Sequence, residues 1–363
     1  MSLIWCAISS HGYGHAAQVV PVLNALARRI GRLCAILRTQ VPSTFFEGRL
    51  TLPYTVSPAA QDVGCVQDGP LTIDIARTWT EHERFHESWD SRLEAEAQAM
   101  VEARPSLILS DISPLAIAAG RRAGIRTAAL GSLTWDMVLE PYLSHAAPAR
   151  QEQTGILNQI RGAYREAALM IRLSPGLPMP AFLLVKDVGP LVQSVAPQRV
   201  ELRERLGVAA GERVAVVAFG GIPLTSLPIA RMEEMAGWQF VVSGTVPSGC
   251  RRIRSAEALP FAFGTTLISG NVIVTKPGYS TVVEAVHHQV PVVYVRRYNF
   301  ADEEGLVRYL HRHGRGLELE REAFQQGWWG DALSAVLRQP APTEPAPEPR
   351  GAVEAAELLA GFF

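Results

Sequence analysis

A strand, a glycine-containing turn, a helix and a second strand follow one another in the last third of the chain, and this run constrains the fold most. Residues 271–274 are an apolar run typical of a buried strand, and Pro277 and Gly278 interrupt it. Residues 282–286 supply the apolar face of a helix, and residues 292–295 form a second apolar run. Two buried strands connected through a helix predict a parallel sheet in an α/β fold.

The turn of this unit suits a diphosphate. A strand that enters a helix through small residues directs backbone N–H groups and the positive end of the helix dipole to one spot. The residues predicted to face that spot are Lys276, Gly278, Tyr279, Ser280, Thr281 and Arg296. Glu284 lies one helical turn after Ser280, where it could accept hydrogen bonds from ribose hydroxyls. A purely structural role for the turn is the alternative, because glycine turns alone are weak signals.

A second glycine turn follows the apolar run of residues 3–8. His11 to His15 form this turn, and residues 16–29 follow it with helical periodicity. The turn has only two glycines and is not followed by an acidic residue after an obvious second strand, which disfavours a dinucleotide fingerprint. We expect Gly14 to lie near the diphosphate and His15 to accept a proton, with its pKa lowered by the helix N-terminus. The structural alternative is a histidine that only caps the helix or fills the turn, and it is favoured for His11.

Together, these two turns resemble those of the GT-B glycosyltransferase superfamily. The resemblance is strongest to the glycosyltransferase-like N-terminal half of L-arabinokinases and its stand-alone bacterial relatives, and weaker to UDP-glycosyltransferases and the lipid-II-forming N-acetylglucosaminyltransferase. The matching segments are HGYGHAAQ at 11–18, SDISPLA at 110–116, LTWD at 133–136, PGLPMPAF at 175–182, FGG at 219–221, TKPGYSTVVEA at 275–285 and VRRYNFADEE at 295–304. They run in the family's order over nearly the whole chain. Two positions depart from the pattern: Gly131-Ser132-Leu133 replaces a small residue plus Asn, and Gln18 stands where Arg is frequent.

The resemblance implies an α/β architecture of two Rossmann-like domains, whose parallel sheets face each other across a cleft. We expect the acceptor-binding domain at residues 1–185 and the nucleotide-sugar-binding domain at 186–338, with the proline-punctuated segment 172–182 returning toward the linker between them. A proline-rich tether, 339–351, then precedes a final helix, 352–363, that crosses back to the first domain. A length of 363 residues suits two domains.

The resemblance also implies a function: inverting, metal-independent transfer of a sugar from a nucleoside diphosphate donor, with uridine favoured, to a hydroxyl or amine acceptor. His15 would be the base. Asp111 or Asp136 would orient it, with Asp111 preferred, although Asp111 could instead cap the helix that starts near Pro114. A nucleotide-sugar hydrolase and a non-catalytic nucleotide-sugar-binding protein are the alternatives.

Further donor contacts are implied in the second domain. Gly220 and Gly221 would let the backbone approach the diphosphate, and the loop from Leu259 to Thr266 would hold the base through main-chain groups. Glu303 and Glu304 match acidic residues that bind donor-sugar hydroxyls in relatives. The alternative is that both glutamates lie at the solvent-exposed start of a helix and bind no ligand.

The composition of the chain limits the kinds of partner that we expect the protein to bind. A net charge of −1 without a basic stripe argues against nucleic acid. The four cysteines are scattered and read as reduced thiols of a cytoplasmic protein, and no metal-ligand spacing, cofactor motif or membrane span stands out. Residues 78–93 are rich in aromatic and imidazole side chains and could pack in the core or line the acceptor site. The oligomeric state stays open.

Overall fold

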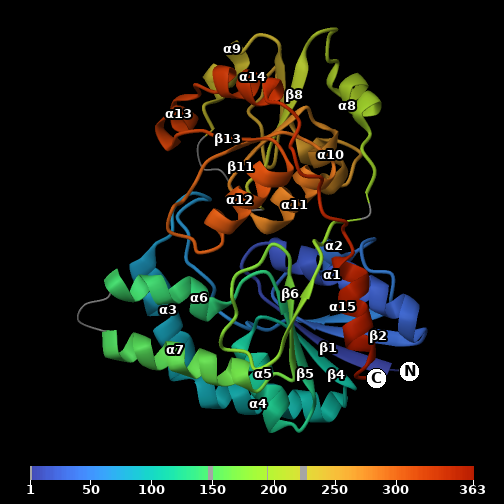
Figure 1. Ribbon diagram of the computed structural model, residues 1–363, viewed down its shortest axis with the longest axis vertical. Coiled ribbons are helices and arrows are strands. Elements are labelled where there is room, and N and C mark those ends of the chain that lie inside the picture. The colour runs from blue at the N-terminus through green and yellow to red at the C-terminus, as the bar shows by residue number, and fades with distance from the viewer. Residues whose placement is uncertain (1, 146–149, 194, 221–226) are drawn as a thin grey trace.

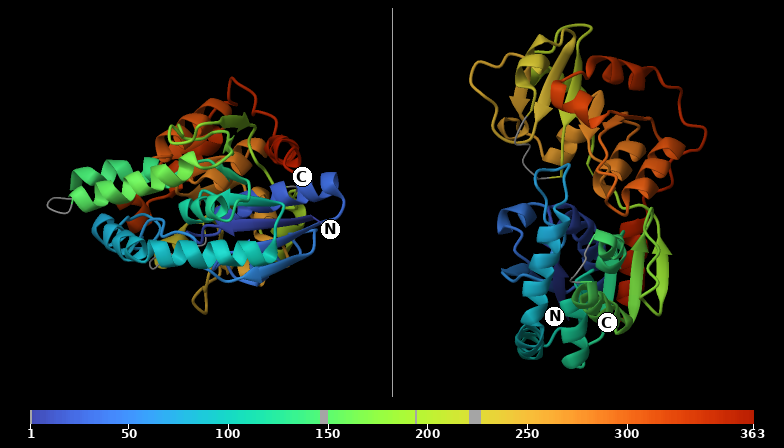
Figure 2. Two further views of the ribbon diagram at one scale, coloured as in Figure 1. Left: turned by 90° about the horizontal axis from the view of Figure 1, so that it is seen from below. Right: turned by 90° about the vertical axis from the view of Figure 1, so that its left-hand side faces the viewer.

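The computed structural model describes residues 2–145, 150–193, 195–220 and 227–363. Two α/β domains lie one above the other, and both chain ends lie on the lower, first domain (Figures 1 and 2). Each domain is built on a parallel sheet. This is the architecture that the alternating strand and helix signals predict.

The first domain holds seven parallel strands in the order β3-β2-β1-β4-β5-β6-β7. The strands are β1 (Ser2–Ile8), β2 (Leu33–Arg38), β3 (Tyr54–Ser57), β4 (Leu107–Asp111), β5 (Thr127–Gly131), β6 (Leu169–Leu173) and β7 (Val185–Val188). The helices are α1 (Gly14–Ile30), α2 (Ser43–Phe46), α3 (Ile75–Glu87), α4 (Trp89–Ala103), α5 (Pro114–Arg122), α6 (Trp135–Leu139) and α7 (Arg150–Arg165). Every residue of β4 and β5 is buried, because helices cover both faces of the sheet.

The second domain holds six parallel strands in the order β10-β9-β8-β11-β12-β13. They are β8 (Arg213–Val217), β9 (Trp238–Val242), β10 (Ile253–Ser255), β11 (Val272–Thr275), β12 (Val292–Tyr294) and β13 (Gly316–Glu318). The helices are α8 (Arg199–Leu206), α9 (Ile229–Glu234), α10 (Phe263–Ser269), α11 (Tyr279–His287), α12 (Glu303–His313), α13 (Arg321–Gln326) and α14 (Gly330–Arg338). The predicted strand–turn–helix–strand unit is β11-α11-β12 at the centre of this sheet.

The domain boundary differs from the prediction. β7 pairs with β6 and therefore belongs to the first sheet, so the first domain ends at Val188 instead of residue 185. The segment 175–180 is consequently a loop within the first domain, and residues 189–198 connect the domains. The prolines of this segment lie in the connection between β6 and β7 of the first sheet, and the linker follows β7.

The aromatic segment of residues 78–93 forms parts of α3 and α4, which meet at Ser88. Its buried side chains are Thr78, Trp79, His82, Phe85 and Trp89. Trp79, Phe85 and Trp89 belong to apolar clusters of the first domain, so packing explains them. Burial lowers the pKa of His82 to about 4, and this ring contacts the main-chain oxygen of Gly64.

The last helix, α15 (Gly351–Ala360), crosses back and packs along α1, as predicted (Figure 1). Glu354 accepts a 2.7 Å hydrogen bond from the Gly189 N–H, and the Gly351 N–H donates to the Pro190 carbonyl. The helix thus holds both the first domain and the start of the linker. In the described residues, no helix is long and apolar enough to cross a membrane.

We expect Gly351→Val to destabilise the protein by about 1–3 kcal/mol, the usual cost of overpacking a filled site. A Cβ at this position would lie 2.2 Å from the Gly189 oxygen and 2.9 Å from the Pro190 oxygen. Gly361→Ala at the other end of α15 is the matched control, because a Cβ there meets nothing closer than 3.6 Å. Urea unfolding of both variants measures the effect, and equal midpoints would show that α15 docking does not depend on this close approach.

Candidate functional site

The glycine turn after β1 meets the Gly220 turn of the second domain between the domains. The turn after β1 and the turn after β8 both lie at the carboxyl ends of their parallel strands. A Cβ at Gly12 would lie 3.4 Å from the main-chain oxygen of Gly220, and both glycines have positive φ values of +79° and +71°. Glycine is favoured at these positions because other residues rarely adopt such φ values. The residues of both turns can therefore act on one ligand.

His15 and Asp111 form a buried pair on the first-domain side. The His15 Nδ1 lies 3.1 Å from the Asp111 Oδ1, and the side-chain exposures are 10% and 1%. The other Asp111 oxygen accepts a hydrogen bond from the Ser9 N–H. Ser113, and not Asp111, caps α5, so the helix-cap alternative for Asp111 is wrong. The structure brings together the two residues that sequence reasoning paired.

The direction of the His15 pKa shift contradicts the prediction from the helix dipole. Burial lowers this pKa, but the charge and hydrogen bond of Asp111, with the charges of Asp62 and Asp302, outweigh burial and raise it. Three carboxyl groups exert a larger electrostatic effect than the partial charge at a helix terminus. His15 therefore binds a proton more tightly than an ordinary histidine.

Asp62 is a residue that sequence reasoning missed. It accepts hydrogen bonds from the Ser9 hydroxyl at 2.9 Å and from the Trp135 indole N–H at 2.9 Å. The Trp135 ring lies 5.7 Å from the His15 ring. Burial raises the pKa of Asp62 to about 6. Asp62 lies in the long connection between β3 and α3, which carries no recognisable pattern, so only the folded structure brings it to the site.

The other first-domain candidates have structural partners. Asp136 pairs with Arg161 at 3.4 Å instead of orienting His15. The His11 ring does not cap α1; it accepts a hydrogen bond from the Cys65 N–H and contacts the Gln67 amide. Gly14 opens α1, and a Cβ there would meet no atom within 4 Å. Room therefore remains beside the start of α1.

Lys276 lies at the end of β11 on the second-domain side. Burial lowers its pKa to about 7, with a further contribution from the positive charge of Arg297. A Cβ at Gly220 would lie 3.9 Å from the Lys276 Cε, so the amine stem runs beside the Gly220 turn. Gly278 precedes α11, whose start has no side-chain cap, and Ser280 and Thr281 lie in its first turn. The described residues thus offer a cation and an uncapped helix start at one place. Gly221 lies outside the described residues.

Two predicted donor contacts of α11 instead hold the interdomain linker. The Tyr279 hydroxyl donates to the Ser174 carbonyl and accepts from the Leu191 N–H, so the side chain is fully used. The Glu284 Oε1 accepts a 2.7 Å hydrogen bond from the Gln193 N–H. The Glu284 Oε2 is buried and has no hydrogen-bond partner in the described structure, and burial raises the pKa of this carboxyl to about 7. The His288 Nε2 lies 3.7 Å from this oxygen, so Oε2 faces an imidazole without forming a hydrogen bond.

The structure does not support the predicted acidic pair after β12. Glu303 is fully buried and accepts hydrogen bonds from the Arg297 side chain and main chain. Glu304 is exposed and pairs with Arg296. Asp302 has the buried, unpartnered oxygen, and its pKa is raised to about 6 by burial. The acidic residue next to the site is therefore Asp302, adjacent to the predicted pair.

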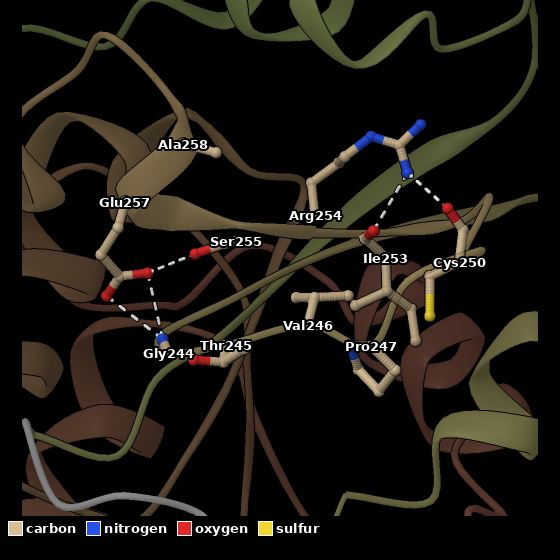
Figure 3. Close-up of a pocket in the computed structure, with 10 residues that line it drawn as sticks. All are labelled: Gly244, Thr245, Val246, Pro247, Cys250, Ile253, Arg254, Ser255, Glu257 and Ala258. Carbon is tan, nitrogen blue, oxygen red and sulfur yellow. Dashed lines mark hydrogen bonds between the residues drawn. The ribbon is translucent and has the colours of Figure 1, made fainter.

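An open pocket of about 620 Å³ lies beside β10, the edge strand of the second sheet (Figure 3). It is formed by Gly244 and the residues after it, by β10, and by Glu257 and Ala258, which precede the predicted base-binding loop. The Glu257 carboxylate accepts hydrogen bonds from the Gly244 N–H and the Ser255 hydroxyl, as Figure 3 shows. This volume falls in the range of small-molecule sites.

Comparisons with known proteins bear on the architecture. No family model matches the chain. L-arabinokinase from Arabidopsis thaliana is 28% identical over 343 residues, which are 91% of this chain and 32% of that protein. The chain thus spans about a third of the length of this curated relative.

Solved glycosyltransferase structures match the whole chain. The glycosyltransferase of kitacinnamycin has a TM-score of 0.62 at 16% identity, with 99% of each chain covered. CalG4, the calicheamicin glycosyltransferase, has a TM-score of 0.62 at 16% identity, with 99% of this chain and 94% of that chain covered. The chain has the GT-B glycosyltransferase fold. UGT2 of Phytolacca americana, complexed with UDP-2-fluoro-glucose and pterostilbene, has a TM-score of 0.60 at 17% identity, covering 99% and 94%.

The GT-B fold accounts for the facing turns. Each parallel sheet presents its carboxyl edge to the other domain, and loops at such edges are where α/β sheets bind ligands. In this GT-B chain, His15 with Asp111 lies on one edge and Lys276 on the other. In the described residues, no group of three His, Cys, Asp or Glu side chains is arranged to hold a metal ion.

Proposed function

We propose that this protein is an inverting glycosyltransferase that moves a sugar from a UDP-sugar to a hydroxyl or amine acceptor, with no metal ion or other cofactor. The observation that carries the proposal is the buried His15–Asp111 pair opposite the Lys276 turn. His15 takes the acceptor proton as the acceptor attacks the anomeric carbon. The bond from that carbon to the diphosphate breaks, and Lys276 and the start of α11 stabilise the charge that develops on the leaving group.

The donor is proposed to lie along the carboxyl edge of the second sheet. Its diphosphate would lie between the Gly220 turn and the N–H groups of Ser280 and Thr281. The Glu284 Oε2 would turn from His288 to the ribose, and Asp302 would bind sugar hydroxyls in place of Glu303. The cavity beside Ala258 would hold the base. Neighbours with the same fold were solved with UDP or UDP-glucose, which supports uridine.

Hydrolysis of the nucleotide-sugar is the second candidate, favoured by direct contacts between the two domains. Leu71 of the first domain packs in the apolar core of the second, and Phe300 of the second packs in that of the first. Arg321 donates hydrogen bonds to Leu71 and Thr72, and the Tyr142 hydroxyl donates to the Asn299 carbonyl at 2.7 Å. Contacts that hold the two domains together beside the site favour water, the smaller nucleophile. Release of free sugar without any acceptor would identify the hydrolase.

We expect UDP to raise the melting temperature, as a ligand of the native state does. Lys276→Met should weaken UDP binding by about 10- to 100-fold, the worth of one charge-assisted hydrogen bond. The chain has one other lysine, the exposed Lys186, so Lys186→Met is the matched control. Calorimetric titration measures both affinities, and an unchanged affinity in Lys276→Met would remove this residue from the site.

The pH dependence of UDP binding provides a separate check on Lys276. The pKa of the free amine is about 7, and a diphosphate anion raises it because the charged amine is favoured beside an opposite charge. Binding therefore takes up a proton, and UDP affinity should fall as pH rises through this pKa. Lys276→Met should lose this component of the pH dependence, whereas Lys186→Met should keep it.

A further inference from the structure

A second cavity, of about 330 Å³, lies on the linker side of the molecule, away from the His15–Asp111 pair. Four parts of the chain form its wall: α1, the segment from α2 to Arg49, the linker at Val192 and Gln193, and Ala352 at the start of α15. Ala262 of the second domain completes it. Its volume is at the lower end of the range for small-molecule sites. The cavity adjoins the predicted base-binding loop through Ala262, but its described lining contains neither the His15–Asp111 pair nor Lys276.

This second cavity, which we call the hinge cavity, has only positively charged groups among the charged residues of its described lining. Its described lining contains two arginines, Arg28 and Arg49, and no acidic side chain. Neither guanidinium has an ion-pair partner among the described residues, and Arg28 is exposed whereas Arg49 is half-buried. Burial lowers the pKa of Arg49, which shows that part of its hydration has been lost. A partly desolvated cation without a counter-ion attracts an anion.

The rest of the lining is apolar apart from two side-chain amides, Asn24 on α1 and Gln193 on the linker. The Arg49 guanidinium lies over the Phe45 ring at 4.6 Å, and Tyr13 stacks on the same ring at 5.2 Å. Val20, Pro21, Val192 and Val195 supply aliphatic surface. The Asn24 amide is held by Arg49 and Thr51, and Gln193 lines the linker side. An apolar pocket with a few convergent polar groups is the usual form of a small-molecule site.

We propose that the hinge cavity binds a small organic anion, with its carboxylate or phosphate on Arg28 and Arg49 and its apolar part on Phe45 and the valines. Arginine suits both anions because its planar guanidinium donates two parallel hydrogen bonds. The ligand would touch both domains, the linker and α15, so it would stabilise the domain arrangement seen here. Gln193 connects the cavity to the nucleotide side, since its N–H donates to Glu284.

The test uses the full chain with benzoate, phenyl phosphate and the neutral benzyl alcohol as probes, measured by calorimetric titration and thermal shift. The two anions should bind and raise the melting temperature, and benzyl alcohol should not. Arg49→Gln should weaken anion binding by about tenfold or more, as loss of a charge-assisted contact does. Arg231→Gln, at an exposed arginine of α9, should bind like the parent.

Two further variants separate this site from others. Ala17→Leu fills the cavity from α1 and leaves both arginines in place, so it should also abolish binding even if Arg49→Gln proves unstable. Lys276→Met should leave the binding of both probes unchanged. The proposal is overturned if no anion binds, if benzyl alcohol binds as well as benzoate, or if Ala17→Leu binds like the parent. Loss of binding in Lys276→Met would place the probes at the diphosphate turn, which also overturns it.

Discussion

His15→Ala should lower turnover of a nucleotide-sugar by about 10²- to 10⁴-fold, the usual worth of a positioned general base. The imidazole is buried between Asp111 and Trp135, and its Nδ1 lies on the Asp111 carboxylate. UDP affinity should stay nearly constant, because the proposed nucleotide contacts belong to the second domain. Coupled detection of released UDP, beside calorimetric titration of UDP, separates the two effects.

The matched control is His287→Ala, at an exposed histidine of α11, which should keep full turnover. Turnover retained in His15→Ala would place the base elsewhere, with Asp62 the nearest carboxyl group of raised pKa. Loss of UDP binding in His15→Ala would instead make the imidazole a phosphate contact. A panel of polyol, amine and aromatic acceptors must first establish the activity, and release of free sugar in their absence would assign hydrolysis.

The sequence was sufficient for the architecture because that depends on local patterns. Apolar runs such as residues 271–274 must be buried on both faces, and glycine at positions 12 and 220 fits turns with positive φ. A strand that ends at Asp111 and a helix that starts near His15 lie at the same sheet edge once the strands are parallel. Their pairing could therefore be expected before the distance was known.

What could not be predicted depends on long connections and on collective charge. Asp62 reaches His15 through a segment without periodicity, and its importance comes from Ser9 and Trp135, which are distant in sequence. Asp302 and Glu303 are adjacent and both carry a carboxylate. The position of Arg297 determines that Glu303 is the one bound by an arginine, while an oxygen of Asp302 is left without a hydrogen-bond partner. The protonation of His15 likewise depends on three carboxyl groups from different parts of the chain. The spacing of residues along the sequence carries no information about the combined effect of these charges on the His15 pKa.

Asp111→Asn should reduce turnover by about 10²- to 10⁴-fold, because a carboxylate that orients a catalytic histidine also fixes its tautomer. The Asp111 oxygens face the His15 Nδ1 and the Ser9 N–H, so Nδ1 carries the proton and Nε2 is free to accept one. In the variant, the amide oxygen must still accept from Ser9, which turns the NH₂ group toward Nδ1. The proton then resides on Nε2, and the base is blocked.

The pH profile distinguishes this role from simple destabilisation. Only neutral His15 can accept a proton, so kcat/KM should fall as pH decreases through the His15 pKa, which Asp111 raises above 6.5. Without the carboxylate, the charge and hydrogen bond of Asp111 no longer raise that pKa while burial still lowers it, so the acid limb of the residual activity should move to lower pH. Asp136→Asn is the control, since Asp136 pairs with Arg161 and should leave the limb in place. An acid limb that stays fixed in Asp111→Asn would show that another group titrates, and that the pair stabilises the fold without taking part in proton transfer.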